Sequence, residues 1–345
     1  MYLLKDYFEI TLIILQDKKT SKHLSKDYNS LGIKIYYFDV NKKKKELLKF
    51  IFRLLQERMK NYDFVLGTSG PNWFTYLTFK IFNSSKKIFY PYDIYLFLWK
   101  NQNVRPGLGV HFEKSNLKNA DFIINRSFKD QIKLVRKDEV KKIKAKIIKF
   151  TPCFDDWMVP INKNKTKKLS LVYTGVCPSS ETFLRVTWTD FFKQFSDQGI
   201  DQHIYALNAA KSQGFNKIDR PNIFYHEPVP NKILNQKISK YHYGIILSFF
   251  KKGFIDDRFF KIGFGNKPLC YLEAGLPLLV DDETVAAELV RKYKCGVIIS
   301  EKDLPNLKKI LEKQNYKELL KGVEKVREEF RMSKRSKKLI KELME

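Results

Sequence analysis

The chain has 345 residues, more than a single hydrophobic core commonly serves, so two domains are expected. Hydrophobic residues make up 43% and the mean hydropathy is -0.39, which is typical of a globular protein in water. The 65 basic and 38 acidic side chains give a net charge of +27, which favours binding to polyanions. This surplus is spread along the chain and no nucleic-acid-binding motif accompanies it, so no nucleic-acid partner is expected.

The cysteines and the absence of long apolar runs bear on location. Cys153, Cys177, Cys270 and Cys295 show neither CxxC nor Cys/His spacing, which argues against a disulfide framework and a structural zinc site. No apolar leader and no run of about 18 uncharged apolar residues is found. We expect a cytoplasmic protein whose basic surplus contacts an anionic membrane surface at the inner face. The alternative is a composition bias spread over solvated surfaces.

In the first half, short β-branched or aromatic runs alternate with segments of helical periodicity. Strands are predicted at residues 10–15, 34–39, 63–66, 87–90, 121–125 and 145–150. The first of these is almost wholly apolar and is expected to be buried in a parallel sheet. Helices are predicted at residues 42–60 and 73–82 and after Ser127, which is expected to be an N-cap. The first helix is expected to bury one face made of Leu47, Phe50, Ile51, Leu54, Leu55 and Met59.

The alternation restarts after a polar stretch. Strands are predicted at residues 169–173, 203–207, 222–225, 243–247, 276–280 and 296–299, and helices at 181–195, 231–239, 267–273, 283–292 and 301–345. The pattern predicts an α/β protein of two doubly wound, Rossmann-like domains that face each other across a cleft. The expected division is an N-terminal domain at 1–156, a linker at 157–168, a C-terminal domain at 169–325 and a terminal helix at 326–345. Ligands should bind beyond the carboxyl ends of the strands.

The most informative segment is Lys267-Pro-Leu-Cys-Tyr-Leu-Glu-Ala-Gly-Leu-Pro-Leu-Leu-Val280. It resembles the signature K-x-x-E-Y-x-A-x-G-x-P-V-[IV] of the group 1 glycosyltransferases (glycosyltransferase family 4-like), with Lys267, Tyr271, Gly275 and Pro277 at matching positions. Further matches follow in chain order at residues 120–127, 151–155, 171–175, 239–247 and 283–296. His242 stands where the family has an aspartate. The resemblance covers about residues 8–330.

The resemblance implies the GT-B fold and a metal-independent reaction without a further cofactor. A sugar would pass from a UDP- or GDP-type nucleotide sugar to a hydroxyl of a glycan, lipid-linked or protein acceptor. Basic side chains would stabilise the leaving diphosphate. The candidate donor-binding residues are Gly175, Arg185, Arg258, Lys261, Lys267, Cys270, Tyr271, Glu273 and Gly275. Cys270 replaces the family's ribose-binding glutamate and is a poor acceptor, so Glu273, one helical turn on, is the candidate substitute.

Two residues of the first half are catalytic candidates. Asp93 follows a strand end and is either a general base for the acceptor hydroxyl or a loop and cap residue. His111 is either an acceptor contact or a surface residue. Tyr92 replaces the family's histidine before the aspartate. The chain begins at what corresponds to the family's second strand, so the N-terminal domain is expected without the first.

Other interpretations remain open. One is a catalytically degenerate protein that binds a nucleotide, a glycan or a partner chain. A sugar-nucleotide epimerase is less favoured, because no cluster of histidines and carboxylates is visible. The aromatic helix around Trp73, together with the lysines at 42–45 and 141–146, either rests on anionic lipid or forms core and solvated surface.

Overall fold

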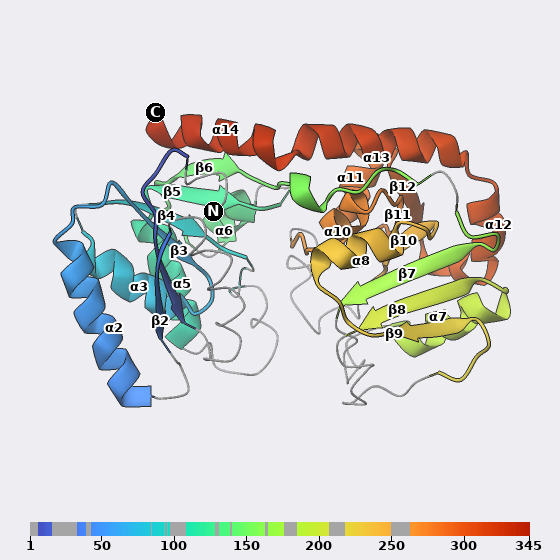
Figure 1. Ribbon diagram of the computed structural model, residues 1–345, viewed down its shortest axis with the longest axis horizontal. Helices are drawn as coiled ribbons and strands as arrows, with labels where there is room; N and C mark the ends of the chain where they lie inside the picture. Colours follow the sequence, from blue (N-terminus) through green and yellow to red (C-terminus); the bar gives the residue numbers. More distant parts are fainter. Residues whose placement is uncertain are drawn as a thin grey trace.

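The computed structural model describes residues 6–15, 33–38, 43–83, 85–92, 94, 96, 108–127, 131–138, 140–162, 165–175, 185–206, 218–249 and 263–345. Two α/β domains lie side by side, and a long C-terminal helical segment runs across both (Figure 1). Every strand pairing in the described residues is parallel. The structure therefore has the two doubly wound domains that the alternation predicted.

The N-terminal domain is built on a four-stranded sheet in sequence order. Its strands are β3 (Phe64–Thr68), β4 (Lys86–Tyr90), β5 (Phe122–Asn125) and β6 (Lys146–Lys149). Its helices are α2 (Lys43–Arg58), α3 (Asn72–Ile81), α5 (Leu108–Asn119) and α6 (Gln131–Asp138). The core between these elements is rich in phenylalanine and isoleucine, with Phe50, Phe89, Ile123 and Ile132 fully buried.

Strands β1 (Thr11–Leu15) and β2 (Lys34–Phe38) form a separate two-stranded sheet. The Tyr62 hydroxyl and Thr11 Oγ1 are hydrogen-bonded at 2.8 Å, which ties this pair to the larger sheet. The first strand was expected to be buried, but the described residues of β1 are only half-buried. The reason is that a strand at the side of a two-stranded sheet has fewer neighbours to cover it.

Two further details of the N-terminal domain differ from the sequence expectation. The six apolar residues of the first helix do not share one buried face: Phe50 and Leu54 are buried, while Leu47, Leu55 and Met59 are exposed. The described part of the domain covers only one side of α2, and its apolar positions span more than that side. Ser127 does not act as an N-cap either, because its buried hydroxyl has no hydrogen-bond partner among the described residues.

The C-terminal domain has a six-stranded parallel sheet in the order β12-β11-β10-β7-β8-β9. Its strands are β7 (Ser170–Gly175), β8 (Asp201–Ala206), β9 (Ile223–His226), β10 (Tyr243–Ile246), β11 (Leu278–Asp281) and β12 (Gly296–Ile299). The chain first builds outward from β7 to β9 and then returns to β10 on the other side of β7. The carboxyl ends of β7 and β10 therefore form a topological switch point, where ligands of such sheets bind.

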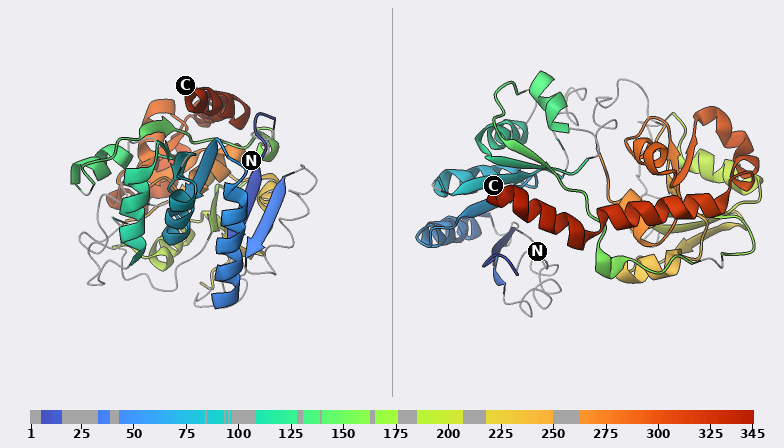
Figure 2. Two further views of the ribbon diagram at one scale, coloured as in Figure 1. Left: turned by 90° about the vertical axis from the view of Figure 1, so that its left-hand side faces the viewer. Right: turned by 90° about the horizontal axis from the view of Figure 1, so that it is seen from above.

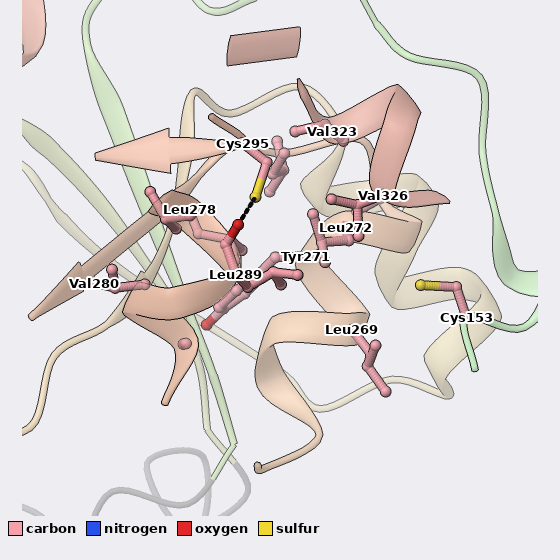
Figure 3. Packing of buried hydrophobic residues seen from close by; sticks show 14 of the residues in the cluster. Cys153, Leu269, Tyr271, Leu272, Leu278, Val280, Leu289, Cys295, Val323 and Val326 are labelled. Atoms are coloured by element: carbon pink, nitrogen blue, oxygen red, sulfur yellow. Dashed lines mark hydrogen bonds between the residues drawn. The ribbon is translucent and has the colours of Figure 1, made fainter. Parts of the chain in front are cut away.

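The helices of this domain cover both faces of the sheet (Figure 1). They are α7 (Trp188–Asp197), α8 (Asn231–Ile238), α10 (Lys267–Glu273), α11 (Ala286–Tyr293), α12 (Leu307–Glu312) and α13 (Tyr316–Phe330), with the 3-10 turn η2 (Glu301–Asn306). Helix α7 starts later than predicted, because Thr187 accepts the Asp190 N–H and caps it. Helix α10 sends Leu269, Tyr271 and Leu272 into the core beside β11 and α13 (Figure 3).

A final helix, α14 (Met332–Met344), follows α13 and returns to the N-terminal domain (Figures 1 and 2). Leu339 and Leu343 pack there with Ile124 and Ile148. At the junction the Cys153 N–H donates to Phe330 O at 2.7 Å, and Met332 N–H donates to Cys153 O at 2.8 Å. The chain thus crosses between the domains at two adjacent points. No helix in the described part of the chain is long and apolar enough to cross a bilayer.

Candidate functional site

A cavity of about 430 Å³ lies between the domains at the switch point of the C-terminal sheet. Its N-terminal side is lined by Tyr90, Tyr92 and Arg126, and the domain junction adds Pro152, Phe154 and Trp157. The C-terminal side includes Thr174, Gly175, Tyr205, Pro228, Val229, Asn266, Lys267, Cys270 and Glu273. A volume of this size accommodates a small-molecule ligand. Four of the nine predicted donor-binding residues lie in its wall.

Lys267 and Gly175 are matched to each other. The Lys267 ammonium lies 4.0 Å from the centre of the Tyr173 ring and 4.9 Å from that of Trp188, and it donates to the Tyr173 hydroxyl at 2.6 Å. Gly175 has a φ of +116° at the end of β7, and a Cβ there would lie 2.9 Å from Lys267 Cε. The backbone conformation therefore favours glycine, and a side chain here would also displace the end of the lysine side chain. The pair puts a positive charge at the cavity wall.

Tyr271 supports this wall from behind and does not line the cavity. Its hydroxyl accepts the Thr174 backbone N–H at 2.9 Å, immediately before Gly175. Its ring lies against Gly244 of β10, where a Cβ would come within 2.2 Å of the ring. The signature tyrosine thus fixes α10 to the carboxyl end of β7 and to the start of β10, which makes it a positioning residue.

Cys270 and Glu273 belong to one hydrogen-bonded network. The Cys270 thiol donates to Asn235 Oδ1 at 3.2 Å, and the Asn235 amide donates to Glu273 Oε2 at 3.3 Å. Glu273 Oε1 accepts the Phe154 backbone N–H at 2.8 Å. Burial, with a smaller contribution from Glu273, raises the pKa of the Cys270 thiol to about 12, so the sulfur is neutral. Both oxygens of Glu273 are engaged in holding α10 to the domain junction.

This environment gives Glu273 an unusual titration. Burial raises the pKa of its carboxyl from 4.5 to about 7, although the hydrogen bonds from Phe154 and Asn235 and the charge of Arg327 act in the opposite direction. The folded protein therefore binds this proton more tightly than the unfolded chain does. As pH rises from about 4.5 to about 7, the free energy of unfolding therefore falls, and this carboxyl contributes at most about 3 kcal/mol to the fall.

We accordingly expect Glu273→Gln to remove this part of the pH dependence. The neutral amide oxygen can still accept the Phe154 N–H, whereas no proton is lost at high pH. Denaturant unfolding at pH 5 and pH 8 should show that the wild type loses more stability than the variant over this interval. Glu312→Gln, at an exposed position of α12, is the control and should lose as much stability between pH 5 and pH 8 as the wild type does. If Glu273→Gln loses as much stability between pH 5 and pH 8 as the wild type, the pKa of the Glu273 carboxyl is not raised as described.

Arg126 is a cavity residue that was not among the predicted site residues. It follows directly after β5 and is only 7% exposed. Its guanidinium donates to Asn266 Oδ1 across the domain boundary and lies 5.4 Å from the centre of the Tyr92 ring. These contacts are with neutral side chains. The sequence held a signal for it, because a cation at the carboxyl end of a parallel strand lies at the edge where ligands bind.

The other predicted residues have different environments. His111 is exposed on α5, and Arg185 forms ion pairs with Glu283 at 2.7 Å and Glu301 at 3.1 Å; neither lines the cavity. Gly275, with a φ of +74°, forms the turn after α10 and packs on Ile161. Asp93, Arg258 and Lys261 lie outside the described residues. Among the residues that the structure describes, no group of three or more His, Cys, Asp or Glu side chains could hold a metal.

Comparison with known proteins defines the class to which this architecture belongs. The model of the glucosyltransferase 3-like C-terminal domain matches residues 188–343, somewhat less than half of the chain. Among curated proteins no match to the sequence is found. The chain has the GT-B fold of glycosyltransferases, as the signature around Lys267 predicted.

Solved structures of similar fold cover nearly the whole chain. Sucrose-phosphate synthase from Thermosynechococcus elongatus is 14% identical with a TM-score of 0.66, over 97% of this chain and 98% of that chain. HepE from Anabaena in complex with UDP-glucose is 10% identical with a TM-score of 0.69, over 99% of this chain and 94% of that one. A UDP-forming trehalose-phosphate synthase from Burkholderia xenovorans is 10% identical with a TM-score of 0.57, over 90% of this chain and 79% of that one. At these identities the likeness concerns the fold.

Proposed function

We propose that the chain is a glycosyltransferase that binds a nucleoside diphosphate sugar in the cavity between its domains. The observation that carries this proposal is the pair of cations in the cavity wall, Lys267 from the C-terminal domain and Arg126 from the N-terminal domain. Both walls of the cavity are otherwise mostly aromatic or neutral. A diphosphate held between the two would draw the domains together, and charge-assisted hydrogen bonds to its oxygens would be strong.

The remaining cavity wall suits the other parts of such a donor. Tyr205, Pro228 and Val229 offer aromatic and apolar surface for the nucleobase. The half-exposed Tyr92 and the partly buried Tyr90 stand on the acceptor side, at the end of β4. A structural relative, HepE, has been solved with UDP-glucose, which supports a uridine nucleotide as the first donor to try.

In the proposed reaction the bond between the anomeric carbon and the diphosphate oxygen breaks, and a bond from that carbon to the acceptor oxygen forms. The nucleoside diphosphate leaves with the bonding electrons, and Lys267 and Arg126 stabilise its charge. The acceptor hydroxyl gives its proton to a base, for which Asp93 is our candidate because it follows Tyr92 in the chain. His111 is left out of this proposal because its side chain is exposed away from the cavity wall. We propose that no metal ion takes part.

A binding measurement tests the proposal. Isothermal titration with UDP, GDP and ADP, in the presence and absence of EDTA, should show binding of at least one nucleotide that EDTA does not weaken. Labelled donor sugars then report transfer or slow donor hydrolysis. A chain that binds none of the nucleotides contradicts the proposal.

One observation favours a second candidate, a protein that binds nucleotides or glycans without transfer. The cavity has a neutral thiol at Cys270, and both oxygens of Glu273 are already engaged. The one carboxylate among the described lining residues, Glu273, therefore has fewer acceptor sites left for ribose hydroxyls. Nucleotide binding by the wild type with neither transfer nor hydrolysis would select this candidate, and sugar transfer by the wild type would reject it.

A further inference from the structure

The outer face of α2, together with Met59 in the turn that follows it, carries a continuous apolar stripe. Leu48, Phe52, Leu55 and Met59 are 67%, 63%, 47% and 79% exposed. Successive residues of a helix are about 100° apart, so these four side chains fall within an arc of about 60°. The opposite side of the helix is buried, because Phe50 and Leu54 pack into the domain core. Scattered exposed apolar residues are ordinary, but a four-residue stripe indicates a surface that meets another apolar phase.

The charges on α2 are arranged around this stripe. Lys45 and Lys49 flank it on one side and Arg58 flanks it on the other, and all three are exposed. The two carboxylates of the helix point away from it. Glu57 is buried and accepts hydrogen bonds from Tyr36 at 2.8 Å and Tyr62 at 2.5 Å. Glu46 lies about 160° from Leu48 around the helix and pairs with Lys49 at 2.9 Å. The outward half of α2 therefore combines apolar and basic residues without an acidic one.

We infer that α2 docks the protein on an anionic lipid surface, with the apolar stripe inserted at the headgroup level and the basic residues against the lipid phosphates. An interfacial helix of this kind needs a broad apolar face flanked by Lys or Arg. A second copy of the chain fits less well. It would bring Lys45 and Arg58 close to their own counterparts, while Glu46 already pairs with Lys49.

The location of α2 agrees with this inference. The helix forms the outer edge of the N-terminal domain, on the side away from the C-terminal domain (Figures 1 and 2). A lipid surface on this edge leaves the cavity between the domains open. The aromatic helix that the sequence offered as a lipid contact does not have this role, because Phe74 stacks on the buried Phe50 with ring centres 4.5 Å apart and Trp73 contacts the same ring.

Flotation of the full chain with lipid vesicles tests the inference. The wild type should bind vesicles that contain phosphatidylglycerol and should not bind pure phosphatidylcholine. Phe52→Asp together with Met59→Asp should weaken binding about tenfold or more. The control is Met344→Asp, which introduces one of these two negative charges at a methionine that is 66% exposed at the end of α14. It should bind like the wild type.

A second variant tests the charges separately. Lys45→Gln, Lys49→Gln and Arg58→Gln together should lower affinity for the anionic vesicles by about a hundredfold, at about fivefold for each charge. Circular dichroism and unaltered nucleotide binding would show that both variants are folded. The vesicle assay contains no nucleotide, so its outcome does not depend on the proposed enzymatic function.

Several results would overturn the inference. They are absence of wild-type binding, equal binding to neutral and anionic vesicles, or full binding by the Phe52→Asp, Met59→Asp variant. Analytical ultracentrifugation tests the other partner considered for this stripe, a second copy of the chain. A wild-type dimer that this variant dissociates would assign the stripe to a second copy of the chain.

Discussion

Lys267→Met is expected to lower the affinity for nucleoside diphosphates about a hundredfold, with little change in fold stability. The ammonium lies beside the Gly175 turn, and a partly buried ion pair of this kind contributes about 3 kcal/mol of binding free energy. Methionine retains an apolar stem that can pack on Tyr173 and Trp188, so the change removes charge more than packing. Isothermal titration with the nucleotide that the wild type prefers gives the two dissociation constants.

The control for this measurement is Lys309→Met, at an exposed position of α12 outside the cavity wall. It removes the same charge from the protein as a whole and should leave the dissociation constant within about twofold of the wild type. A Lys267→Met protein that is folded and binds as tightly as the wild type would show that the diphosphate does not lie beside this lysine.

Gly244→Ala is expected to destabilise the C-terminal domain by about 3 kcal/mol and to disturb the donor site with it. A Cβ at this position would come within 2.2 Å of the Tyr271 ring. Neither group can yield easily, because Gly244 pairs with both β7 and β11, and the Tyr271 hydroxyl is bonded to Thr174. Overpacking at a rigid site of this kind costs free energy in the folded state. Thermal and denaturant unfolding measure the loss.

Gly109→Ala is the matched control, since a Cβ there meets no atom within 4 Å. In α5 alanine is also the better helix former, so the control should be neutral or slightly stabilising. Nucleotide binding by the Gly244→Ala protein should be weaker wherever it remains folded, because displacement of Tyr271 moves Thr174 and the Gly175 turn. Wild-type stability in this variant would mean that the contact between Gly244 and Tyr271 relaxes at no cost.

The fold followed largely from local sequence patterns. Apolar runs such as the one at β11 and helical periodicity such as that of α13 depend on neighbouring residues, so both were recognisable in the chain alone. The signature at Lys267 was also local, because one helix, one turn and one strand hold all of its parts. Where local signals were weak, the predictions differ from the structure: α7 begins only at Trp188, and within the described part of the chain the Ser127 hydroxyl has no hydrogen bond with which to cap a helix.

The candidate site was predicted only in part. Gly175, Lys267, Cys270 and Glu273 line the cavity as expected, because they stand at strand ends or on the signature helix. Arg126 was not anticipated as a site residue, since its partner Asn266 is 140 residues away in the chain. The engagement of Glu273 by Phe154 and Asn235 was equally invisible. No pattern within a single segment shows which residue of another domain it will meet.

The sequence by itself determined the alternation of strands and helices, the two-domain division and the segment that carries the family resemblance. All three depend on residues that are close along the chain, where spacing alone sets which side chains share a face. The tertiary structure decided which apolar face of α2 is buried and which is left to the surroundings. It also decided that Arg126 and Lys267 line one cavity and that Glu273 is hydrogen-bonded to the domain junction. These are contacts between segments that are distant in the chain, and they exist only once the domains are packed together.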